Sequence, residues 1–577
     1  MGCGSSTASE EKKEVPPLCL PHQVSPELKK TRDEAIAKQR SVYDVIFDQF
    51  EGKRLPPRVK ELSPDETHNM HLVNQFVDLT STQASLGLNS VLEKVSSFVL
   101  GKTDPYKVYS DYYRTSTVPA VAARWKDDLE FARQRINGVN PTLLYRLDTL
   151  PPNVPISDDI LRGLLPASAP GLQQLLQQKR LFAVNYKRLD LIRPYIPSDS
   201  TLCSPIAIFC IDDSKELAPL GIQLFQNPSP ANPVFTPNPS HTTPGAWMHA
   251  RMHCQAADIL LHEVEAHLFS THLYTESIYV AMMRNLPPVH PVHQLVKPHF
   301  WGTMAVDFKG REVLLGENAI MPRLMGGGNR GTIALLAQAW SDHHFMDNMH
   351  FPSLVKRRGL ETLPWCPFRD DGLEFWAVLE AFVKDIVNSA YWTEGDVAKD
   401  SEMANWFQEL GSMGIIGLPC QKPTTRQHII TFLTCLIFTA TAGHTMVNGP
   451  QWDFVGFVPN APGKFHMKAL QSTKVELSDA DIAKALPQND DSIEQIVVVK
   501  TLSAEPHEAA MLGEYPEGHL EDMSGDTGGA AVQRFKSGLA QLSSKIQQRE
   551  NSLQGPNASV RVYPYLDPAK VCNSVCM

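Results

Sequence analysis

The sequence lacks the patterns that mark several large classes of protein. Its ten cysteines contain no CxxC pair and follow no regular spacing, which favours buried or free thiols in a reducing compartment over a disulfide framework. The formal net charge is −10 and no block of Lys and Arg is longer than a few residues, so binding to nucleic acid by neutralising phosphates is not expected. The start has no apolar core of a signal peptide, and no GxSxG motif indicates an acyl hydrolase with a serine nucleophile.

Apolar residues, by contrast, are abundant enough for an extensive core, at 42% of 577 residues. After residues 1–25, which we interpret as a flexible tail, neither a repeat nor a shift in composition marks a further domain boundary. One strand pair is predicted at 205–212 and 219–225. Apolar spacing near i, i+3 and i+4 predicts helices from residue 26 onward and around 81–100, 120–136, 170–180, 250–284, 331–348, 371–391, 402–413, 425–447 and 528–552. The sequence therefore predicts a single, mainly α-helical domain over residues 26–577 with a small β element.

The N-terminus, MGCGSSTASEEKK, carries an acylation pattern. Removal of Met1 exposes Gly2, and Ser6 stands where N-myristoylation requires Ser or Thr. Cys3 could carry a palmitoyl group, and two acyl chains are needed for lasting attachment to a bilayer. The alternative is a chance match in a flexible tail. We expect lipidation at Gly2 and Cys3, and hence a cytoplasmic protein that is held at a membrane.

A second stretch resembles a membrane span in its length only. Residues 427–452 contain no Asp, Glu, Lys or Arg and are long enough to cross a bilayer. They also contain two histidines, an asparagine, several threonines and a Gly-Pro break, and these polar groups are costly against lipid. We therefore predict a buried helix in the core of the protein.

Histidines concentrate in residues 247–300, around the segment HEVEAHLFSTH. Its His262, His267 and His272 follow one another at steps of five, so the i, i+4 geometry of an HExxH zinc site is absent. On a regular α-helix a five-residue step turns the side chain by roughly 140°. A π-type turn would bring the imidazoles together, and such turns occur mostly at functional sites.

The apolar helix adds a second pair of candidate ligands, His444 and Asn448, which share one face at i, i+4. Any one of these histidines alone would be interpreted as a core residue that bonds a backbone carbonyl. Three imidazoles and an amide on two buried helices instead indicate a metal site. Nitrogen and oxygen ligands without a thiolate suit iron(II), manganese or zinc, and the spacing does not choose among them.

These motifs resemble those of the animal-type lipoxygenase family. The stretch from His262 to Phe300 is similar to the family's iron-binding helix through its histidine, Arg-x-Leu-Pro and His-Pro landmarks. The similarity continues at GHTMVNGPQWDFVGFVPNAP and at the terminus CNSVCM, where the family usually ends in Asn-Ser-Val/Ile-x-Ile. It covers most of residues 140–577, and the three separated motifs agree in order and spacing.

The resemblance implies a dioxygenase that adds O2 to a polyunsaturated fatty acid and so forms a hydroperoxide. It implies one non-heme iron per chain, held by the side chains of His267, His272, His444 and a weaker Asn448 and by the C-terminal carboxylate of Met577. Met577 replaces the usual isoleucine, which leaves the main-chain carboxylate in place. Glu263 and Gln451 match positions that orient ligands and substrate.

The resemblance also assigns residues to a substrate cavity. Leu314 matches the leucine that clamps the pentadiene, and Lys309 is a candidate partner for a substrate carboxylate, with a surface lysine as the alternative. Gly310 stands where the family carries Ala with S hydroperoxides and Gly with R hydroperoxides, so an R product is expected. The positions that set the depth of the cavity match Ile259, Leu324 and Met325.

The start of the chain departs from the family pattern. Animal and plant lipoxygenases usually begin with a β-barrel lipid-binding domain, and no run of alternating strands precedes the catalytic part here. We expect the acyl chains to replace that module and its calcium-dependent docking. Two alternative functions stay open, which are a hydroperoxide isomerase that uses the same iron site and a lipid-anchored scaffold with a degenerate site.

Overall fold

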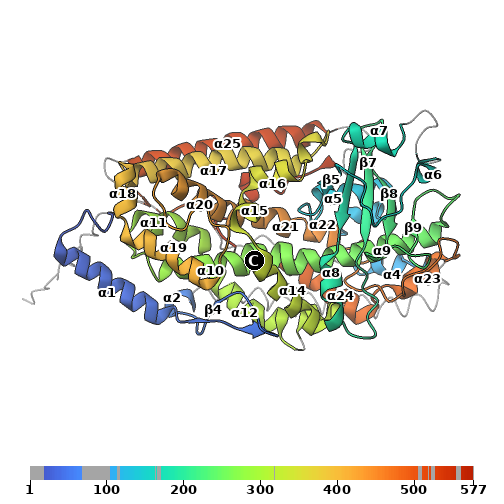
Figure 1. Ribbon diagram of the computed structural model, residues 1–577, viewed down its shortest axis with the longest axis horizontal. Helices are drawn as coiled ribbons and strands as arrows, with labels where there is room; N and C mark the ends of the chain where they lie inside the picture. Colours follow the sequence, from blue (N-terminus) through green and yellow to red (C-terminus); the bar gives the residue numbers. More distant parts are fainter. Residues whose placement is uncertain are drawn as a thin grey trace, which may run out of the picture.

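The computed structural model describes residues 18–67, 104–113, 117–162, 164, 170–317, 319–503, 510–516, 519–520, 527–553 and 561–575. Most of them lie in helices that follow the longest axis of the molecule, with a small sheet at one end (Figure 1). The mainly helical fold that the sequence predicts is confirmed. The predicted helix at 81–100 lies outside the described residues, and so do Gly2 and Cys3.

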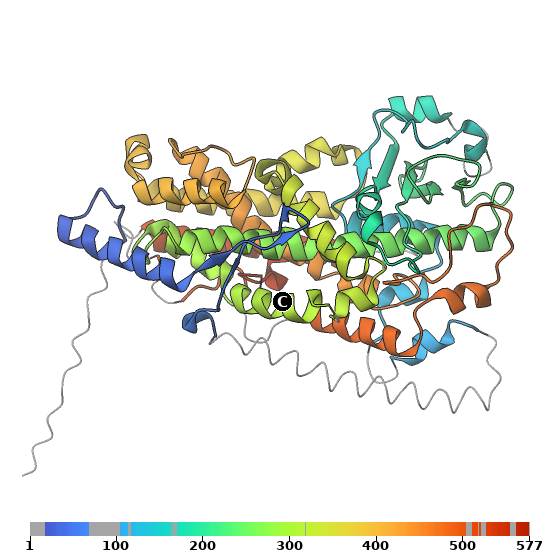
Figure 2. The ribbon, with the colours of Figure 1, turned by 60° about the horizontal axis from the view of Figure 1, so that its bottom comes forward.

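One long helix runs through the middle of the molecule (Figure 2). It consists of α9 (Pro244–Leu261), the π-helical segment η4 (His262–Leu273) and α10 (Tyr274–Met283), which follow one another without a break. Thr243 caps its start, because the side chain accepts a hydrogen bond from the Ala246 amide. Most residues of the three segments are buried, so the helix has no solvent-facing side.

A second core helix lies against the first. It is formed by α20 (Arg426–Phe438), the π-helical segment η7 (Thr439–Gly443) and α21 (His444–Asn448). Its length and composition would suffice to cross a membrane, but 78% of its apolar window is buried inside the molecule. The buried core helix that the sequence predicts is therefore present. His262 Nε2 donates to the Val447 carbonyl at 2.8 Å and joins the two core helices directly.

Outer helices cover this pair. α17 (Pro367–Ala390) and α25 (Thr527–Ser552) lie side by side along one edge of the molecule (Figure 1). Phe382 and Phe535 stack between them with ring centroids 4.4 Å apart. On another side, α12 (Thr303–Leu315) and α14 (Gly328–Asp342) pack against η4.

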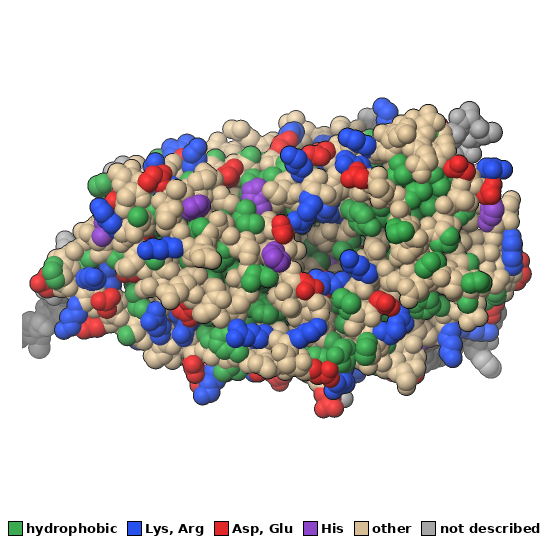
Figure 3. All heavy atoms as spheres, viewed as in Figure 1, with side chains coloured by type: hydrophobic (Ala, Val, Ile, Leu, Met, Phe, Trp, Pro, Cys, Tyr) green, Lys and Arg blue, Asp and Glu red, His purple; other side chains and the backbone are tan. Residues whose placement is uncertain are grey.

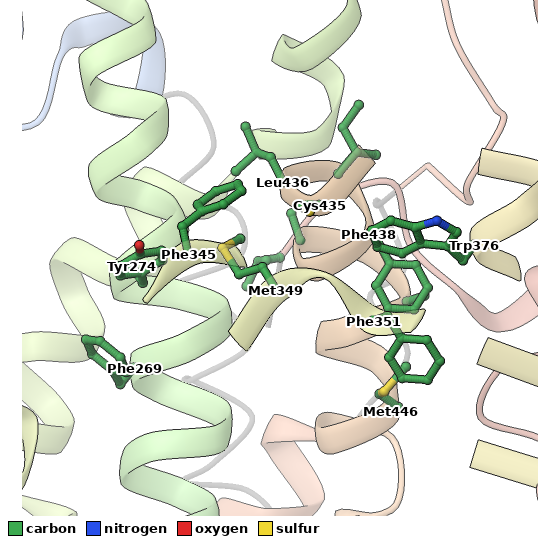
Figure 4. Close-up of a cluster of buried hydrophobic side chains, with 14 of the residues drawn as sticks. Phe269, Tyr274, Phe345, Met349, Phe351, Trp376, Cys435, Leu436, Phe438 and Met446 are labelled. Carbon is green, nitrogen blue, oxygen red and sulfur yellow. The ribbon is translucent and has the colours of Figure 1, made fainter. Parts of the chain in front are cut away.

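Aromatic and sulfur-containing side chains fill the core between α20 and its neighbours (Figure 4). The ring centroid of Phe438 on α20 lies 5.2 Å from that of Trp376 on α17 and 5.0 Å from that of Phe351. Each fully buried side chain of this size stabilises the fold by about 1.5–3 kcal/mol. This packing fixes the end of α20 at Phe438. His444 follows only six residues later in the chain, so its position is fixed as well.

A five-stranded antiparallel sheet lies at one end of the molecule (Figure 1). Its strands pair in chain order and are β5 (Tyr145–Arg146), β6 (Leu181–Asn185), β7 (Ile206–Ile211), β8 (Leu217–Gln223) and β9 (Val234–Phe235). β7 and β8 form the strand pair that the sequence predicts, with a register shift between Ile208 and Phe209. The other three strands extend the predicted pair on both sides.

Short helices and strands connect these elements. The predicted helix at 120–136 divides into a 3₁₀ turn and α5, and the one at 331–348 begins three residues earlier and divides into α14 and α15. In the described part of the chain, the α-helices other than α1 and those named above are α2 (Pro64–Thr67), α4 (Lys107–Asp111), α5 (Asp128–Asn137), α6 (Asp158–Leu161), α7 (Leu172–Gln177), α8 (Arg188–Leu191), α11 (Pro291–Val296), α13 (Ile320–Leu324), α15 (Phe345–Met349), α16 (Phe351–Arg357), α18 (Glu394–Lys399), α19 (Ser401–Met413), α22 (Gln451–Val455), α23 (Asp479–Ala485) and α24 (Asn489–Leu502). Four two-residue strands precede them, β1 (Val45–Ile46), β2 (Gln49–Phe50), β3 (Lys53–Arg54) and β4 (Arg58–Val59).

The boundary of the flexible tail at residue 25 is wrong. Leu20 is fully buried in the main core, and the Cys19 amide donates to the carbonyl of Val289 at 3.1 Å. α1 (Pro26–Val42) follows, and its Arg32 forms a buried ion pair with Glu402 of α19. A lone buried leucine in a proline-rich stretch gives no periodic signal, which is why the sequence argument extended the tail too far. Residues 18–25 belong to the folded domain.

Candidate metal centre and substrate cavity

Three histidine side chains from the two core helices converge in the interior. His267 and His272 lie in η4, and His444 begins α21. The Nε2 atom of His267 lies 3.3 Å from Nε2 of His444 and 3.4 Å from Nε2 of His272. All three side chains are buried. The structure thus brings together the imidazoles that the sequence singled out.

The π-helical geometry of η4 produces this convergence. A regular α-helix would turn His272 roughly 140° away from His267, and the wider turn of a π-helix closes that angle. A second π-helical segment, η7, directly precedes His444. The hydroxyls of Thr271 and Thr441 each donate to the carbonyl four residues earlier at 2.7 Å, a bond that often accompanies a bend in a helix.

Carboxylates behind two of the imidazoles set where the ring proton lies. His267 Nδ1 lies 3.4 Å from Oε2 of Glu263, and His272 Nδ1 lies 2.7 Å from Oδ1 of Asp307. Burial lowers the pKa of His267 to about 4 and the pKa of His272 to about 3, so both rings are neutral near pH 7. The carboxylate acceptors hold the single proton at Nδ1 and leave the Nε2 lone pair directed at the centre.

This donor set fits a metal ion. The Nε2 atoms of His267 and His272 have no hydrogen to share across 3.4 Å, so their approach is favourable only when a cation accepts both lone pairs. Imidazole nitrogens without a thiolate suit iron, manganese or zinc. The described part of the chain holds one other cluster of candidate ligands, His290, Asp400 and Glu402. There Glu402 pairs with Arg32 and His290 with Asp400, so those groups already satisfy one another.

Asn448 and Gln451 lie next to the three histidines along the second core helix. Asn448 is one turn beyond His444, and its Oδ1 accepts a hydrogen bond from Gln451 Nε2 at 2.6 Å. This bond fixes the orientation of the Asn448 amide, which agrees with the orienting role expected for Gln451. Met577 lies outside the described residues. The nearby Val575 is fully buried, and its carbonyl accepts from Thr303 at the start of α12 at 3.0 Å.

An apolar cavity borders the three-histidine centre. His267 and His272 form one part of its wall, and aliphatic side chains from the central helix, α12, α13 and α24 form most of the rest. An almost wholly apolar lining of this kind suits a hydrocarbon chain. The predicted substrate residues that line it are Ile259, Gly310, Leu314, Leu324 and Met325.

Lys309 is not among the residues that line this cavity, and its contact with a substrate carboxylate stays a prediction. Its ammonium group pairs with the carboxylate of Glu312 at 2.8 Å, and both side chains are partly or largely exposed. A helix turns by about 100° per residue, so Lys309 and the adjacent Gly310 point to different sides of α12. The surface-lysine alternative is the one that the structure supports.

Gly310 leaves unfilled space in the cavity wall. A Cβ atom at this position would have Leu314 Cδ1 as its nearest neighbour, at 3.9 Å, which is an ordinary van der Waals contact. The residue lies in the middle of α12, where alanine would be favoured over glycine by about 1 kcal/mol. Neither a turn nor a close backbone approach requires glycine here, so its effect on the site is the space that it leaves.

Comparison with known proteins decides the family. A family model described as lipoxygenase matches residues 32–566. The chain belongs to the lipoxygenase family. Human hydroperoxide isomerase ALOXE3 is 30% identical over 85% of this chain and 68% of its own length, and the allene oxide synthase-lipoxygenase protein of Plexaura homomalla is 29% identical over 85% of this chain and 48% of its own length. The chain thus spans between about half and about two thirds of these curated relatives.

Solved lipoxygenase structures share the fold. An anaerobic crystal structure of a lipoxygenase with a Delta413-417:GS replacement, in complex with arachidonate, superimposes with a TM-score of 0.87 at 26% identity and covers 97% of this chain and 84% of that chain. The crystal structure of coral 8R-lipoxygenase gives a TM-score of 0.83 at 26% identity, over 97% and 83% of the two chains. The chain is therefore an oxidoreductase of the lipoxygenase type with the catalytic fold of the family.

One residue of this lipoxygenase site was not found from the sequence. Asp307 is 2% exposed, lines the cavity and contacts His272, and burial raises the pKa of its carboxyl to about 7. A usable signal was present, because Asp307 lies three residues before Gly310 and so shares its helix face. A carboxylate on the cavity side of a buried helix needs a partner, and the His272 imidazole is that partner.

A second cavity adjoins the apolar cavity of this lipoxygenase. Met325 and Gly463 line both spaces, so they form part of the partition between them. The second cavity has a more polar wall that includes His253, Lys464 and His466. The apolar cavity therefore has a more polar space beside it, with Met325 and Gly463 bordering both.

Proposed function

We propose that this lipoxygenase is a dioxygenase with one non-heme iron per chain that converts a polyunsaturated fatty acid and O2 into a hydroperoxide. The observation that carries the proposal is the convergence of three imidazole Nε2 atoms beside an apolar cavity. Iron bound there would supply the one-electron redox chemistry for removing hydrogen from a methylene between two cis double bonds. The arachidonate complex of a lipoxygenase with the same fold supports this class of substrate.

The residues of the chain provide position, exclusion of water and control of protons. Leu268 and Leu314 lie on the cavity wall near the centre, where they hold the hydrocarbon chain and keep water out. Glu263 and Asp307 hold the protons of His267 and His272 at Nδ1, so that both Nε2 atoms are available to the metal. The space at Gly310 gives O2 access to one end of the pentadiene, which we propose leads to an R-configured product.

Oxygen uptake with arachidonate or linoleate, followed by chiral chromatography, tests this proposal. We expect O2 consumption, about one iron per chain and a mainly R-configured hydroperoxide. His267→Ala should lose iron and activity together, because the remaining strong ligands form an incomplete set. Asn448→Ala should weaken iron binding less. Full oxygenase activity in His267→Ala would contradict the proposal.

A hydroperoxide isomerase with the same iron site is the second candidate. Two relatives favour it by name, since one is a hydroperoxide isomerase and the other an allene oxide synthase-lipoxygenase protein. An isomerase rearranges an added hydroperoxide without net consumption of O2. Incubation with a fatty-acid hydroperoxide under nitrogen, beside O2 uptake on the free fatty acid, separates the two. Rapid loss of hydroperoxide with no uptake on the fatty acid would favour the isomerase.

We also propose that acyl groups at Gly2 and Cys3 hold the enzyme on a cytoplasmic membrane surface. The pattern at the N-terminus supports this, and both residues precede the folded domain, which includes Leu20. On the face shown in Figure 3, positive and negative side chains are interspersed, so attachment through that face would depend on acyl chains rather than on a broad basic area. Gly2→Ala should move the protein to the soluble fraction of eukaryotic cells, and Cys3→Ser should weaken attachment. Equal distribution of wild type and Gly2→Ala would show a chance match.

A further inference from the structure

The apolar cavity offers nothing that would bind the carboxylate of a fatty acid. Its described lining includes neither Lys nor Arg, and its acidic side chains are Glu263 and Asp307, which contact the histidines of the centre. Gln495, which also lines it, is committed to the backbone. Its Oε1 accepts from the Gly463 amide at 3.0 Å, and its Nε2 donates to the carbonyl of Ala461 at 2.9 Å. A carboxylate inside this cavity would lose its hydration without gaining a cation, which is costly.

The second cavity contains the positive charge that the apolar cavity lacks. Lys464 directly follows Gly463 and is the one Lys or Arg among the described residues that line either cavity. Its ammonium group donates to the carbonyl of Arg323 near the end of α13, and no carboxylate in the described part of the chain forms an ion pair with it. Asp199 and Asp491 attract it from beyond ion-pair distance. Because an ammonium group has three hydrogens, Lys464 can bind a further acceptor.

The border between the two cavities allows a hydrocarbon chain to reach this lysine. Met325 and Gly463 line both spaces, so Lys464 is one residue away from the wall of the apolar cavity. The Met325 side chain is partly buried and has three rotatable bonds, so it can adapt its shape to a chain beside it. A Cβ atom at Gly463 would lie 2.5 Å from the carbonyl oxygen of Leu324, and the glycine therefore leaves this part of the border without a side chain.

We propose that Lys464 binds the carboxylate of the fatty acid in the second cavity, while the hydrocarbon chain passes Met325 and lies in the apolar cavity. The inference rests on the proposed oxygenation of fatty acids, and it adds the direction in which the substrate lies. The carboxylate accepts a charge-assisted hydrogen bond from the ammonium group. Asp199 and His466 on the wall of the second cavity are exposed, so the carboxylate keeps part of its hydration there.

A comparison of a fatty acid with its methyl ester tests the inference, because the two share their hydrocarbon chain and differ in charge. O2 uptake is measured on linoleic acid and on methyl linoleate in the same detergent micelles. We expect kcat/KM of the wild type to be higher for the acid. Lys464→Gln should lower kcat/KM for the acid about tenfold, mainly through KM, and leave the ester unchanged. Lys464→Arg keeps the charge and should keep most of the preference for the acid.

Two further variants serve as controls of opposite kinds. Lys468→Gln removes an exposed lysine of the same segment that lines neither cavity, so the ratio of acid to ester should stay at the wild-type value. Asp199→Asn removes a negative charge from the wall of the second cavity, so the preference for the acid should increase. A decrease in Asp199→Asn would count against a carboxylate site in this cavity.

The outcomes separate the inference from the proposed function. A wild type that oxygenates neither substrate would contradict the proposed function itself. A wild type that is active on both with equal kcat/KM would overturn the inference alone, and this result needs no variant. Equal slowing of both substrates in Lys464→Gln would also overturn it, because the lysine would then serve only to hold the Arg323 carbonyl. Loss of the preference in Lys309→Gln but not in Lys464→Gln would assign the carboxylate to the other lysine.

A second variant covers the case in which Lys464→Gln is not recovered. Lys464→Met keeps the aliphatic part of the side chain and removes the charge, and the same comparison of acid and ester applies to it. Failure of both variants to fold would show that Lys464 is required by the fold, and it would overturn the inference.

Discussion

A single methyl group at position 310 is expected to decide which end of the pentadiene receives oxygen. Gly310→Ala fills the open space beside Leu314 without a clash, so the fold should be kept and α12 stabilised by about 0.5–1 kcal/mol. A difference of ~1.4 kcal/mol between the competing barriers changes the product ratio tenfold. Chiral chromatography should show a shift from an R to an S hydroperoxide with oxygen at the other end of the same pentadiene. Gly411→Ala, at a helical glycine with open space around it, should leave the product unchanged.

Met325 separates the substrate cavity from its polar neighbour, so its size is expected to limit how far the fatty acid enters. Met325→Ala should join the two spaces and let the chain slide deeper. Because the fatty acid then enters further, a carbon farther from the leading end reaches the metal. At least a tenth of the product should carry oxygen at that more distant position. Met321→Ala is the control, because Met321 lines the substrate cavity but not the second one. An unchanged regiochemistry in Met325→Ala, measured by mass spectrometry, would show that another residue sets the depth.

At the scale of single residues, the sequence predicted which apolar residues line the cavity, but it did not predict the location of the charged residues near it. Ile259, Gly310 and Met325 were found because the resemblance fixes their positions in helices, and a helix fixes which face they share. Lys309 lies outside the cavity lining because one helical step from Gly310 turns its side chain toward the surface. Asp307 was overlooked although it shares a helix face with Gly310, because the family resemblance marked no role for its position and its partner His272 lies 35 residues away.

At the scale of elements, α1 is expected to depend on one ion pair for its attachment. Arg32 and Glu402 are 3% and 6% exposed, so Arg32→Ala leaves an uncompensated carboxylate in the interior. Unfolding by denaturant should show a loss of about 3–5 kcal/mol. The neighbouring pair Lys30–Glu34 on the same helix is largely exposed, so Lys30→Ala should change stability by less than about 0.5 kcal/mol. A small effect of Arg32→Ala would show that other contacts carry the attachment, such as the hydrogen bonds from Arg40 to the Arg284 carbonyl and to Asn285.

The long elements of this fold are the ones that sequence periodicity predicts. α17 and α25 have apolar patterns over many turns, and the predicted bounds of these helices and of the central helix agree with the structure within six residues at each end. β5 and β9 have two residues each, which is too short for an alternating pattern. The π-helical turn of η4 could be inferred only because two candidate ligands lie five residues apart. The similar segment η7 carries no such marker and was not predicted.

At the scale of the whole molecule, metal removal is expected to weaken the core. The three histidines link parts of the chain 177 residues apart, so a bound ion connects the two core helices. A metal present at 100 times its dissociation constant stabilises the folded state by about 2.7 kcal/mol. Treatment with a chelator should lower the melting temperature and increase amide hydrogen exchange in η4 and α21. Restoration of both by Fe2+ but not by Ca2+ would be expected from the nitrogen-rich donor set.

The absence of a solvent-facing side on the central helix has a consequence for how the protein is made. An amphipathic helix can rest on a partly formed core, but α9, η4 and α10 need neighbours on every side. Several of those neighbours come later in the chain, such as α21, whose Val447 carbonyl bonds His262, and α19, whose Trp406 donates to the carbonyl of Ile278 at 3.2 Å. A nascent chain that has not yet reached α20 therefore exposes an apolar helix with unsatisfied polar groups, and such chains aggregate readily. We expect synthesis of this enzyme to depend on chaperones until the second core helix has emerged, and fragments that stop before residue 426 to be insoluble.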